Sequence, residues 1–288
     1  MLAYDARPVS DAALRLGIPQ VLDRICVRPP YFALTDLTLE GCSFAATAMA
    51  EAPAFLERGP MTAAEVGRHA AIAGLCHAAL SQADHKRRYY LAQRAECRYT
   101  PNAAPYGTPV RLQTEVRSLT KRQAQVAVRA TAAGQDFATL DIDYTILTEP
   151  TFERLFAHRA RPARLATNPY RQLLQTDYQQ SGEQAEQVIA HVPAAACSGH
   201  FDDYPALPVA VLMGQLSYLA GQIIADKPRP FRVLKGLVDA SDLCWSGESA
   251  RFRVVRTTTQ ARVRAFDCEA YAGERKVGSM KLWAELVH

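Results

Sequence analysis

The chain has 288 residues, of which 49% are hydrophobic and 22% charged, and its formal net charge is +4. This composition is that of a globular protein, and it excludes a disordered chain. The basic residues are spread along the sequence, so it gives little support to nucleic-acid binding. The seven cysteines contain no C-x-x-C pair, which indicates reduced thiols in a cytoplasmic protein rather than a disulfide framework or a zinc site. Residues 1–17 lack the continuous apolar segment of a secretory signal.

The first half of the chain predicts a strand, a long helix and a strand meander, in that order. Residues 43–55 are β-prone, and residues 62–80 form an alanine-rich apolar segment of helical length. Residues 111–147 alternate between apolar and polar side chains, with turn signals at 118–122 and 133–135. This alternation is typical of long antiparallel strands that are buried on one face.

The second half predicts the same order of elements. Residues 187–197 are β-prone, a helix is expected over 209–225, and alternating strands are expected over 250–286 with a turn at 272–274. No charged side chain occurs from Pro205 to Ala225. Two prolines and several polar residues interrupt this uncharged segment, which favours a helix buried inside a protein over one that crosses a membrane.

The two halves resemble each other as an internal repeat. Residues 29–40 and 168–180 both contain Pro-Tyr followed by an apolar stretch that ends in Thr-Asp. Two pairs of helix glycines match at one offset, Gly67 with Gly214 and Gly74 with Gly221. Glycine costs about 1 kcal/mol inside a helix relative to alanine, so the matching pairs indicate close backbone packing.

These features divide the chain into two repeats and a connector. We expect residues 1–148 to form an N-terminal repeat that contributes the helix 62–80, residues 149–168 a linker, and residues 169–288 a C-terminal repeat. The linker is rich in proline and arginine, which favours a solvated surface connector and leaves contact with an acidic partner open.

The segment GHFDDYPALPVAVLM resembles the active-site signature of the 3-hydroxyacyl-acyl carrier protein dehydratases, G-H-F-P-x-x-P-x-x-P-G. Five residues fall in register with that signature: Gly199, His200, Phe201, Pro205 and Pro208. The resemblance implies an α+β fold, a double hotdog in which two antiparallel sheets each wrap around a long central helix.

The resemblance also implies roles for the residues of this motif. In the family the histidine is the base, so His200 is expected to remove a proton from the carbon next to the thioester carbonyl. The backbone N–H of Val209, after Pro208, is expected to bind the thioester oxygen at the helix N-terminus. Tyr204 is expected either to line the site or to anchor the loop through its hydroxyl.

The family's helix acid is displaced in this sequence. It would fall at Gly214, but each hotdog site pairs the histidine of one half with the helix of the other, where the equivalent residue is Gly67. Glu65, Arg68 and His69 flank that glycine, and Glu65 and His69 are four residues apart on one helical face. Glu65 or His69 is expected to assist the substrate hydroxyl, and Arg68 is a candidate substrate-binding residue. Each also has a structural alternative: Glu65 as a helix cap, Arg68 as its ion-pair partner and His69 as a packed core side chain.

The first half has no histidine equivalent to His200, so we expect one complete site and one degenerate site. The expected activity is reversible dehydration of a 3-hydroxyacyl thioester carried on acyl carrier protein or coenzyme A, without a metal or redox cofactor. The alternatives are a hotdog thioesterase, an isomerase or acyltransferase on the same fold, and a non-catalytic acyl-carrier-binding subunit. The fused repeats are compatible with a monomeric pseudo-dimer or a homodimer.

Overall fold

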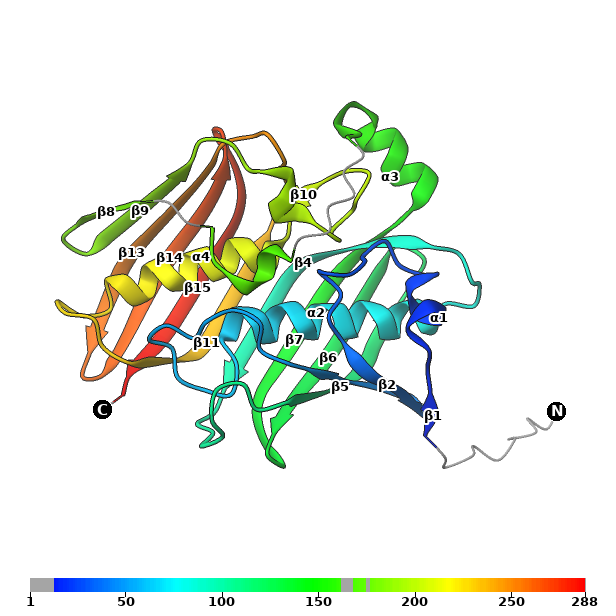
Figure 1. The fold of residues 1–288 in the computed structure, drawn as a ribbon, viewed down its shortest axis with the longest axis horizontal. Coiled ribbons are helices and arrows are strands. Elements are labelled where there is room, and N and C mark those ends of the chain that lie inside the picture. The colour runs from blue at the N-terminus through cyan, green and yellow to red at the C-terminus, as the bar shows by residue number, and fades with distance from the viewer. Residues whose placement is uncertain (1–12, 162–167, 175–176, 288) are drawn as a thin grey trace.

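The computed structural model describes residues 13–161, 168–174 and 177–287 of the chain. In these residues a 13-stranded antiparallel sheet curves behind two long helices, which lie side by side on the same face of the sheet (Figure 1). The elements of the first half are β1 (Leu14–Arg15), α1 (Ile18–Leu22), β2 (Thr35–Glu40), β3 (Ser43–Ala48), α2 (Ala63–Leu80), β4 (Arg88–Tyr99), β5 (Val110–Leu119), β6 (Gln123–Ala132) and β7 (Gln135–Thr148).

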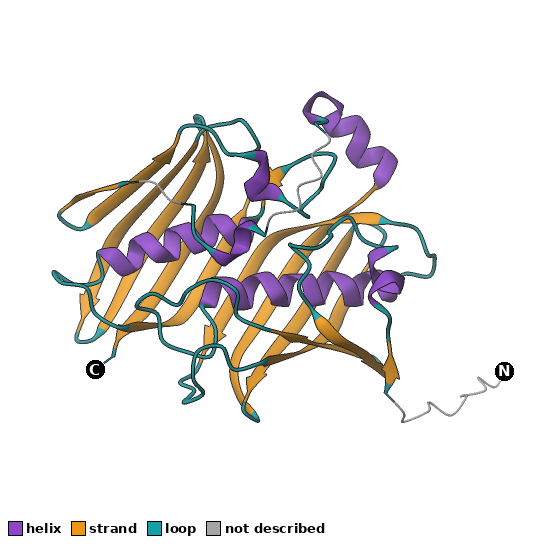
Figure 2. Cartoon of the chain, in the orientation of Figure 1, coloured by secondary structure: helices purple, strands orange, loops and turns teal. Residues whose placement is uncertain are grey.

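A short helical connector, α3 (Glu149–Phe156) and η1 (Ala157–Arg159), leads to the second half. The elements of the second half are η2 (Pro169–Arg171), β8 (Tyr178–Ser181), β9 (Gln184–Ile189), η3 (Ala194–Cys197), β10 (Ala206–Leu207), α4 (Val209–Gln222), β11 (Phe231–Ala240), β12 (Cys244–Trp245), β13 (Ala250–Gln260), β14 (Val263–Ala272) and β15 (Arg275–Leu286). Figure 2 shows how the strands dominate both halves.

The strand order shows that the two halves are related by a pseudo-twofold axis. The sheet runs β1-β2-β3-β5-β6-β7-β4-β11-β15-β14-β13-β9-β8, so each half contributes a meander and the halves join where β4 pairs with β11. At this seam Arg94 lies opposite Asp239, and Arg98 lies opposite Lys235. Each half also has its own hydrophobic core, built around α2 in the first and α4 in the second.

The predicted helices and hairpins are confirmed within a few residues. Helix α2 begins after Thr62, whose hydroxyl accepts a hydrogen bond from the backbone N–H of Glu65 and so caps the helix. The strand meanders turn where the sequence predicted, between β5 and β6, between β6 and β7, and between β14 and β15. No helix of the described residues has the length and apolar character needed to span a bilayer.

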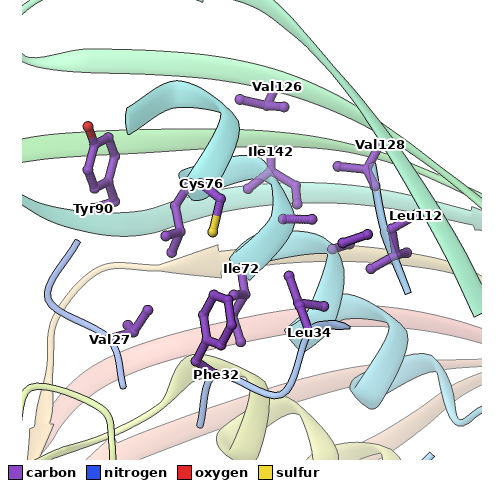
Figure 3. Packing of buried hydrophobic residues seen from close by; sticks show 14 of the residues in the cluster. Val27, Phe32, Leu34, Ile72, Cys76, Tyr90, Leu112, Val126, Val128 and Ile142 are labelled. Atoms are coloured by element: carbon purple, nitrogen blue, oxygen red, sulfur yellow. The ribbon is translucent and has the colours of Figure 1, made fainter. Parts of the chain in front are cut away.

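Both long helices are buried on most of their surface because apolar residues occur all around them. Figure 3 shows Ile72 and Cys76 of α2 among Leu112, Val126 and Ile142 of the sheet. Each fully buried aliphatic side chain of this kind contributes ~1.5–3 kcal/mol to the stability of the fold.

One matching pair of helix glycines lets aromatic rings of the sheet approach the helices. A Cβ atom at Gly74 would lie 2.5 Å from the hydroxyl of Tyr144, and one at Gly221 would lie 2.7 Å from the ring of Phe231. The predicted close packing is therefore present at Gly74 and Gly221, but the prediction was wrong for Gly67, where a Cβ atom would meet nothing within 4 Å.

The connector differs from the solvated linker that the sequence predicted. Residues 149–156 form helix α3, and the side chain of Phe152 is 0% exposed. Its ring stacks on Tyr89 with centroids 3.6 Å apart and lies edge-on to Phe201 at 5.4 Å. Phe152 and Phe156 are four residues apart and so share one helix face, which anchors the connector next to the His200 loop.

Candidate functional site

The loop that carries His200 is held against the first half of the molecule. Gly199 has a φ of +75°, and a Cβ atom there would collide with the backbone of Arg28 and Tyr31. The Gly199 carbonyl accepts a hydrogen bond of 2.8 Å from the Arg28 amide, and His200 forms a β-bridge with Val27. Glycine permits both the left-handed backbone and this close approach.

The imidazole of His200 is fixed in one tautomer. Its Nδ1 lies 2.8 Å from the carbonyl oxygen of Ala206, which can only accept, so Nδ1 carries the proton and Nε2 carries the lone pair. Nε2 has no hydrogen-bond partner among the described residues, and it is not sealed from solvent. The residue is 8% exposed, and burial lowers the pKa of His200 to about 4.

Two aromatic rings hold this imidazole. Phe201 stacks on it with centroids 4.0 Å apart, and Tyr31 of the first half meets it edge-on at 5.0 Å. Tyr31 was not among the predicted site residues, although it belongs to the repeated Pro-Tyr segment that the sequence singled out. Its hydroxyl has no partner among the described residues, and burial raises the pKa of Tyr31 to about 12, which keeps the hydroxyl protonated.

His200 and Tyr31 line an apolar cavity of about 240 Å³ at the seam between the halves. The cavity lies between the two long helices and strands β4, β7, β11 and β15, and its exposed lining residues are Gln93, Arg94, Ser241 and Asp242. These polar residues indicate that the cavity opens where the middle of β4 meets the end of β11.

Helix α2 presents only small or apolar side chains to this cavity. The α2 residues in its lining are Ala63, Ala64, Gly67, Ala71, Ile72 and Leu75. The helix therefore brings no ionisable side chain to the cavity that His200 faces.

The N-terminus of α4 is open in this cavity. Val209 and Ala210 are the first two residues of the helix and line the cavity, and their backbone N–H groups have no partner among the described residues. Pro208 is the N-cap and offers no side-chain acceptor. Free amide donors and the helix dipole give this point a positive potential.

The N-terminus of α2, the pseudo-symmetric counterpart, is instead closed by the chain itself. The carboxylate of Glu57 accepts a hydrogen bond of 2.6 Å from the backbone N–H of Ala63, the first residue of α2. Burial raises the pKa of Glu57 to about 7. One helix start is thus available to a ligand while the other is occupied by an internal carboxyl group.

Glu65 and Arg68 line a second, smaller pocket on the other side of α2. The Glu65 carboxylate accepts hydrogen bonds from the backbone N–H groups of Glu51 and Ala52 and from the hydroxyl of Tyr106. Arg68 forms a 2.6 Å ion pair with Glu51 and donates to the carbonyl oxygen of Tyr31. These contacts tie loops of the first half to α2.

The remaining candidates lie away from the cavity lining. His69 is 0% exposed in the core of the first half, neither ring nitrogen has a partner among the described residues, and burial lowers the pKa of His69 to about 3. Tyr204 packs edge-on against Phe152 of α3 at 5.4 Å. Of the seven candidates, the structure brings His200 and Val209 to one cavity, with Pro208 as the N-cap of α4.

Within the described ranges, no cluster of three or more His, Cys, Asp or Glu side chains resembles a metal site.

No protein-family model and no curated protein sequence matches this chain. Solved structures do resemble it. The 12:0-ACP thioesterase from Umbellularia californica superimposes with a TM-score of 0.59 at 10% identity, over 86% of this chain and 95% of that one. A hotdog-fold protein from Alicyclobacillus acidocaldarius gives 0.54 at 12% identity, over 91% and 99% of the two chains.

The acyl-CoA thioesterase II TesB2 from Mycobacterium marinum gives a TM-score of 0.51 at 10% identity, over 93% of this chain and 98% of that one. Such identities carry the fold and not the activity. The mirrored meanders, the seam between β4 and β11, the two long helices on one face and these likenesses together show that the chain has the α+β double hotdog fold.

Proposed function

We propose that this protein hydrolyses acyl thioesters, with His200 as the general base and the start of α4 as the oxyanion site. One observation carries the proposal: His200, whose Nε2 has no partner among the described residues, lines the same cavity as Val209 and Ala210, whose N–H groups are likewise unpaired there. A base and preorganised amide donors are the two parts that acyl transfer to water requires.

The chemistry follows from these groups. A water molecule next to Nε2 attacks the thioester carbonyl and gives its proton to the imidazole, while the negative charge that develops on the carbonyl oxygen is stabilised by the amide N–H groups of α4. The intermediate then collapses, the carbon–sulfur bond breaks, and the imidazolium returns the proton to the departing thiolate. The hydrogen bond to Ala206 orients the ring and stabilises the imidazolium throughout.

The cavity suits an acyl chain. Its walls are formed mostly by Ala, Val, Leu and Ile, and its exposed polar residues lie at the opening. The lining residues of α2 extend from Ala63 to Leu75, which corresponds to ~18 Å along the helix axis. The solved structures named as acyl-ACP and acyl-CoA thioesterases support the thioester class, and a phosphopantetheine arm of acyl carrier protein or coenzyme A would enter from the opening.

Dehydration of a 3-hydroxyacyl thioester is the second candidate, favoured by the spacing of His200, Pro205 and Pro208. That reaction needs a second group to protonate the leaving hydroxyl. The small residues on the cavity face of α2 weigh against it, because the expected helix acid has no counterpart there. Hydrolysis needs no such acid and is therefore the preferred assignment.

The test uses His200→Asn, because the asparagine amide can still donate to Ala206 while the base at Nε2 is lost. We expect the variant to keep its melting temperature and to lose ~100-fold or more of kcat, measured by mass spectrometry of palmitoyl and 3-hydroxyacyl thioesters of coenzyme A and acyl carrier protein. Release of free acid and thiol supports hydrolysis, whereas loss of water supports dehydration. His191→Ala, at an exposed histidine, is the matched control. Unchanged turnover in His200→Asn overturns the assignment.

A further inference from the structure

Ser217 places an unpaired hydroxyl group at the wall of the cavity. The residue lies on α4, is 6% exposed, and lines both the His200 cavity and the smaller pocket next to it. Its Oγ is buried and has no hydrogen-bond partner among the described residues. Ser217 thus adds a buried polar atom to a wall that is otherwise mainly apolar and whose other buried polar side chains include His200, Tyr31 and Tyr90.

The unpaired state is unusual for a serine inside a helix. Such a hydroxyl ordinarily donates to the carbonyl oxygen four residues earlier, here Met213, or points to solvent. A buried hydroxyl without a partner is unfavourable by ~1–3 kcal/mol. Within the described residues nothing accepts a hydrogen bond from this hydroxyl, which leaves an oxygen atom of a ligand as its candidate partner.

The two halves differ at this position. The offset that matches Gly67 with Gly214 places Ser217 opposite Ala70 in α2, and Ala70 is fully buried in the first core. The hydroxyl is therefore present in the helix whose N-terminus is open and absent from the helix whose N-terminus Glu57 closes. This asymmetry associates the hydroxyl with the open site.

The distance between Ser217 and the start of α4 indicates which part of an acyl chain could reach the Ser217 hydroxyl. Ser217 is eight residues beyond Val209, which corresponds to ~12 Å along the axis of α4. If the thioester carbonyl lies at Val209, as the proposed function requires, then the group that meets Ser217 belongs to the distal part of the acyl chain rather than to the carbons next to the thioester.

We propose that Ser217 donates a hydrogen bond to an oxygen substituent, a hydroxyl or an oxo group, on the distal acyl chain, so that the preferred substrates are oxygenated acyl thioesters. The proposal rests on the proposed thioesterase function and names its substrate class. A site that pairs a buried hydroxyl with a substrate oxygen discriminates against the chain that lacks this oxygen, because the hydroxyl is then left unpaired.

The experiment compares palmitoyl-CoA with a series of hydroxypalmitoyl-CoA thioesters in which the hydroxyl is moved along the chain. We expect wild-type kcat/KM to peak for a mid-chain hydroxyl, about tenfold above palmitoyl-CoA. In Ser217→Ala this preference should vanish because kcat/KM falls for the hydroxy substrate but not for palmitoyl-CoA. The melting temperature of the variant should be unchanged or higher. Equal kcat/KM along the series in the wild type, or a preference that survives in Ser217→Ala, overturns the proposal.

A binding measurement separates this proposal from the thioesterase assignment. Non-hydrolysable thioether analogues of the same chains are titrated into His200→Asn and into His200→Asn combined with Ser217→Ala. Tighter binding of the mid-chain hydroxy analogue that depends on Ser217 supports the inference even if no thioester is hydrolysed. Hydrolysis of all chains at one rate with equal binding of all analogues leaves the thioesterase assignment standing and refutes the role of Ser217.

Discussion

At the residue scale, backbone contacts rather than charged neighbours set the properties of His200. The carbonyl oxygen of Ala206 fixes the tautomer, and burial lowers the pKa of His200 to about 4. Asp202, which lies close in sequence, accepts a hydrogen bond of 2.9 Å from the Gly199 amide and serves the turn. The imidazole is therefore an uncharged base at neutral pH, and its position depends on Gly199, Tyr31 and Phe201.

Tyr31→Phe should lower kcat by ~10–100-fold with little change in melting temperature, because it removes a hydroxyl that can donate a hydrogen bond to the departing thiolate while the His200 imidazolium returns the proton. The ring that meets His200 and Arg68 remains in this variant. Steady-state kinetics and thermal unfolding measure the two effects. Tyr170→Phe is the control, since the Tyr170 hydroxyl donates to the Ser198 carbonyl at 2.7 Å and should affect stability instead. Equal kcat in Tyr31→Phe and the wild type would remove the hydroxyl from the mechanism.

At the element scale, α2 and α4 are equivalent helices of the two halves, and they differ in how their N-termini are capped. Both are apolar helices packed on the curved sheet, and both have a glycine against an aromatic ring. They differ at their first turns, where α2 has the side chains of Thr62 and Glu57 as acceptors for its N–H groups, while α4 follows Pro208 and has no side-chain cap among the described residues. A difference of a few polar contacts thus separates a structural helix start from a candidate binding site.

Gly67→Leu should block the cavity without harming the fold. A Cβ atom at Gly67 meets nothing within 4 Å, and Gly67 lines the cavity. Leucine also favours a helix more than glycine does. We expect roughly 10–200-fold lower kcat/KM for palmitoyl-CoA and little change for acetyl-CoA, with Gly67→Ala giving a smaller effect. The comparison is made by steady-state kinetics with thioesters of increasing length.

Gly74→Ala is the contrasting substitution on the same helix. Its Cβ would approach the hydroxyl of Tyr144 to 2.5 Å, so the melting temperature should fall while the preference for chain length stays as in the wild type. A change in chain-length preference in Gly74→Ala but not in Gly67→Leu would contradict this assignment of the two glycines.

At the scale of the whole molecule, the continuous sheet brings buried titratable groups of both halves into one folding unit. Burial lowers the pKa of His69 to about 3 and that of His200 to about 4, whereas it raises the pKa of Glu57 to about 7. Below about pH 6.5 both histidines become protonated in the unfolded chain but stay neutral in the folded chain. Their contribution therefore makes the unfolding free energy decrease as the pH falls. Glu57 has the opposite effect, because the folded state binds its proton more tightly.

The contribution of His69 can be isolated with His69→Leu. Between pH 7 and pH 5 the wild type should lose ~2 kcal/mol more of its unfolding free energy than the variant, measured by urea denaturation. His69→Leu should also be at least as stable as the wild type at pH 7, because it removes two buried nitrogen atoms without partners. Parallel pH profiles for the two proteins would refute an imidazole that stays neutral in the folded core.

The strand meanders, the two long helices and the repeat could be predicted because they rest on local periodicity and on matched glycines. The seam strands β4 and β11 were not predicted, since their cavity-facing residues Ala92, Ala95 and Gly236 are small and give no clear alternation. The helical connector was also missed. Its single buried face depends on Phe152 meeting Tyr89 and Phe201, which lie far away in the sequence.

For the candidate site, the sequence by itself identified the His200 segment, through the spacing of a glycine, a histidine and two prolines, and predicted the helix that follows it. Which groups face that histidine was decided only by the tertiary structure. Packing of the two helices across the seam turns Gly67 and Ala71 towards the cavity, leaves Glu65 and Arg68 on the other side of α2, and buries His69 in the core. The rotation of a helix about its own axis is set by long-range packing, and a nearly uniformly apolar helix carries no local signal of it.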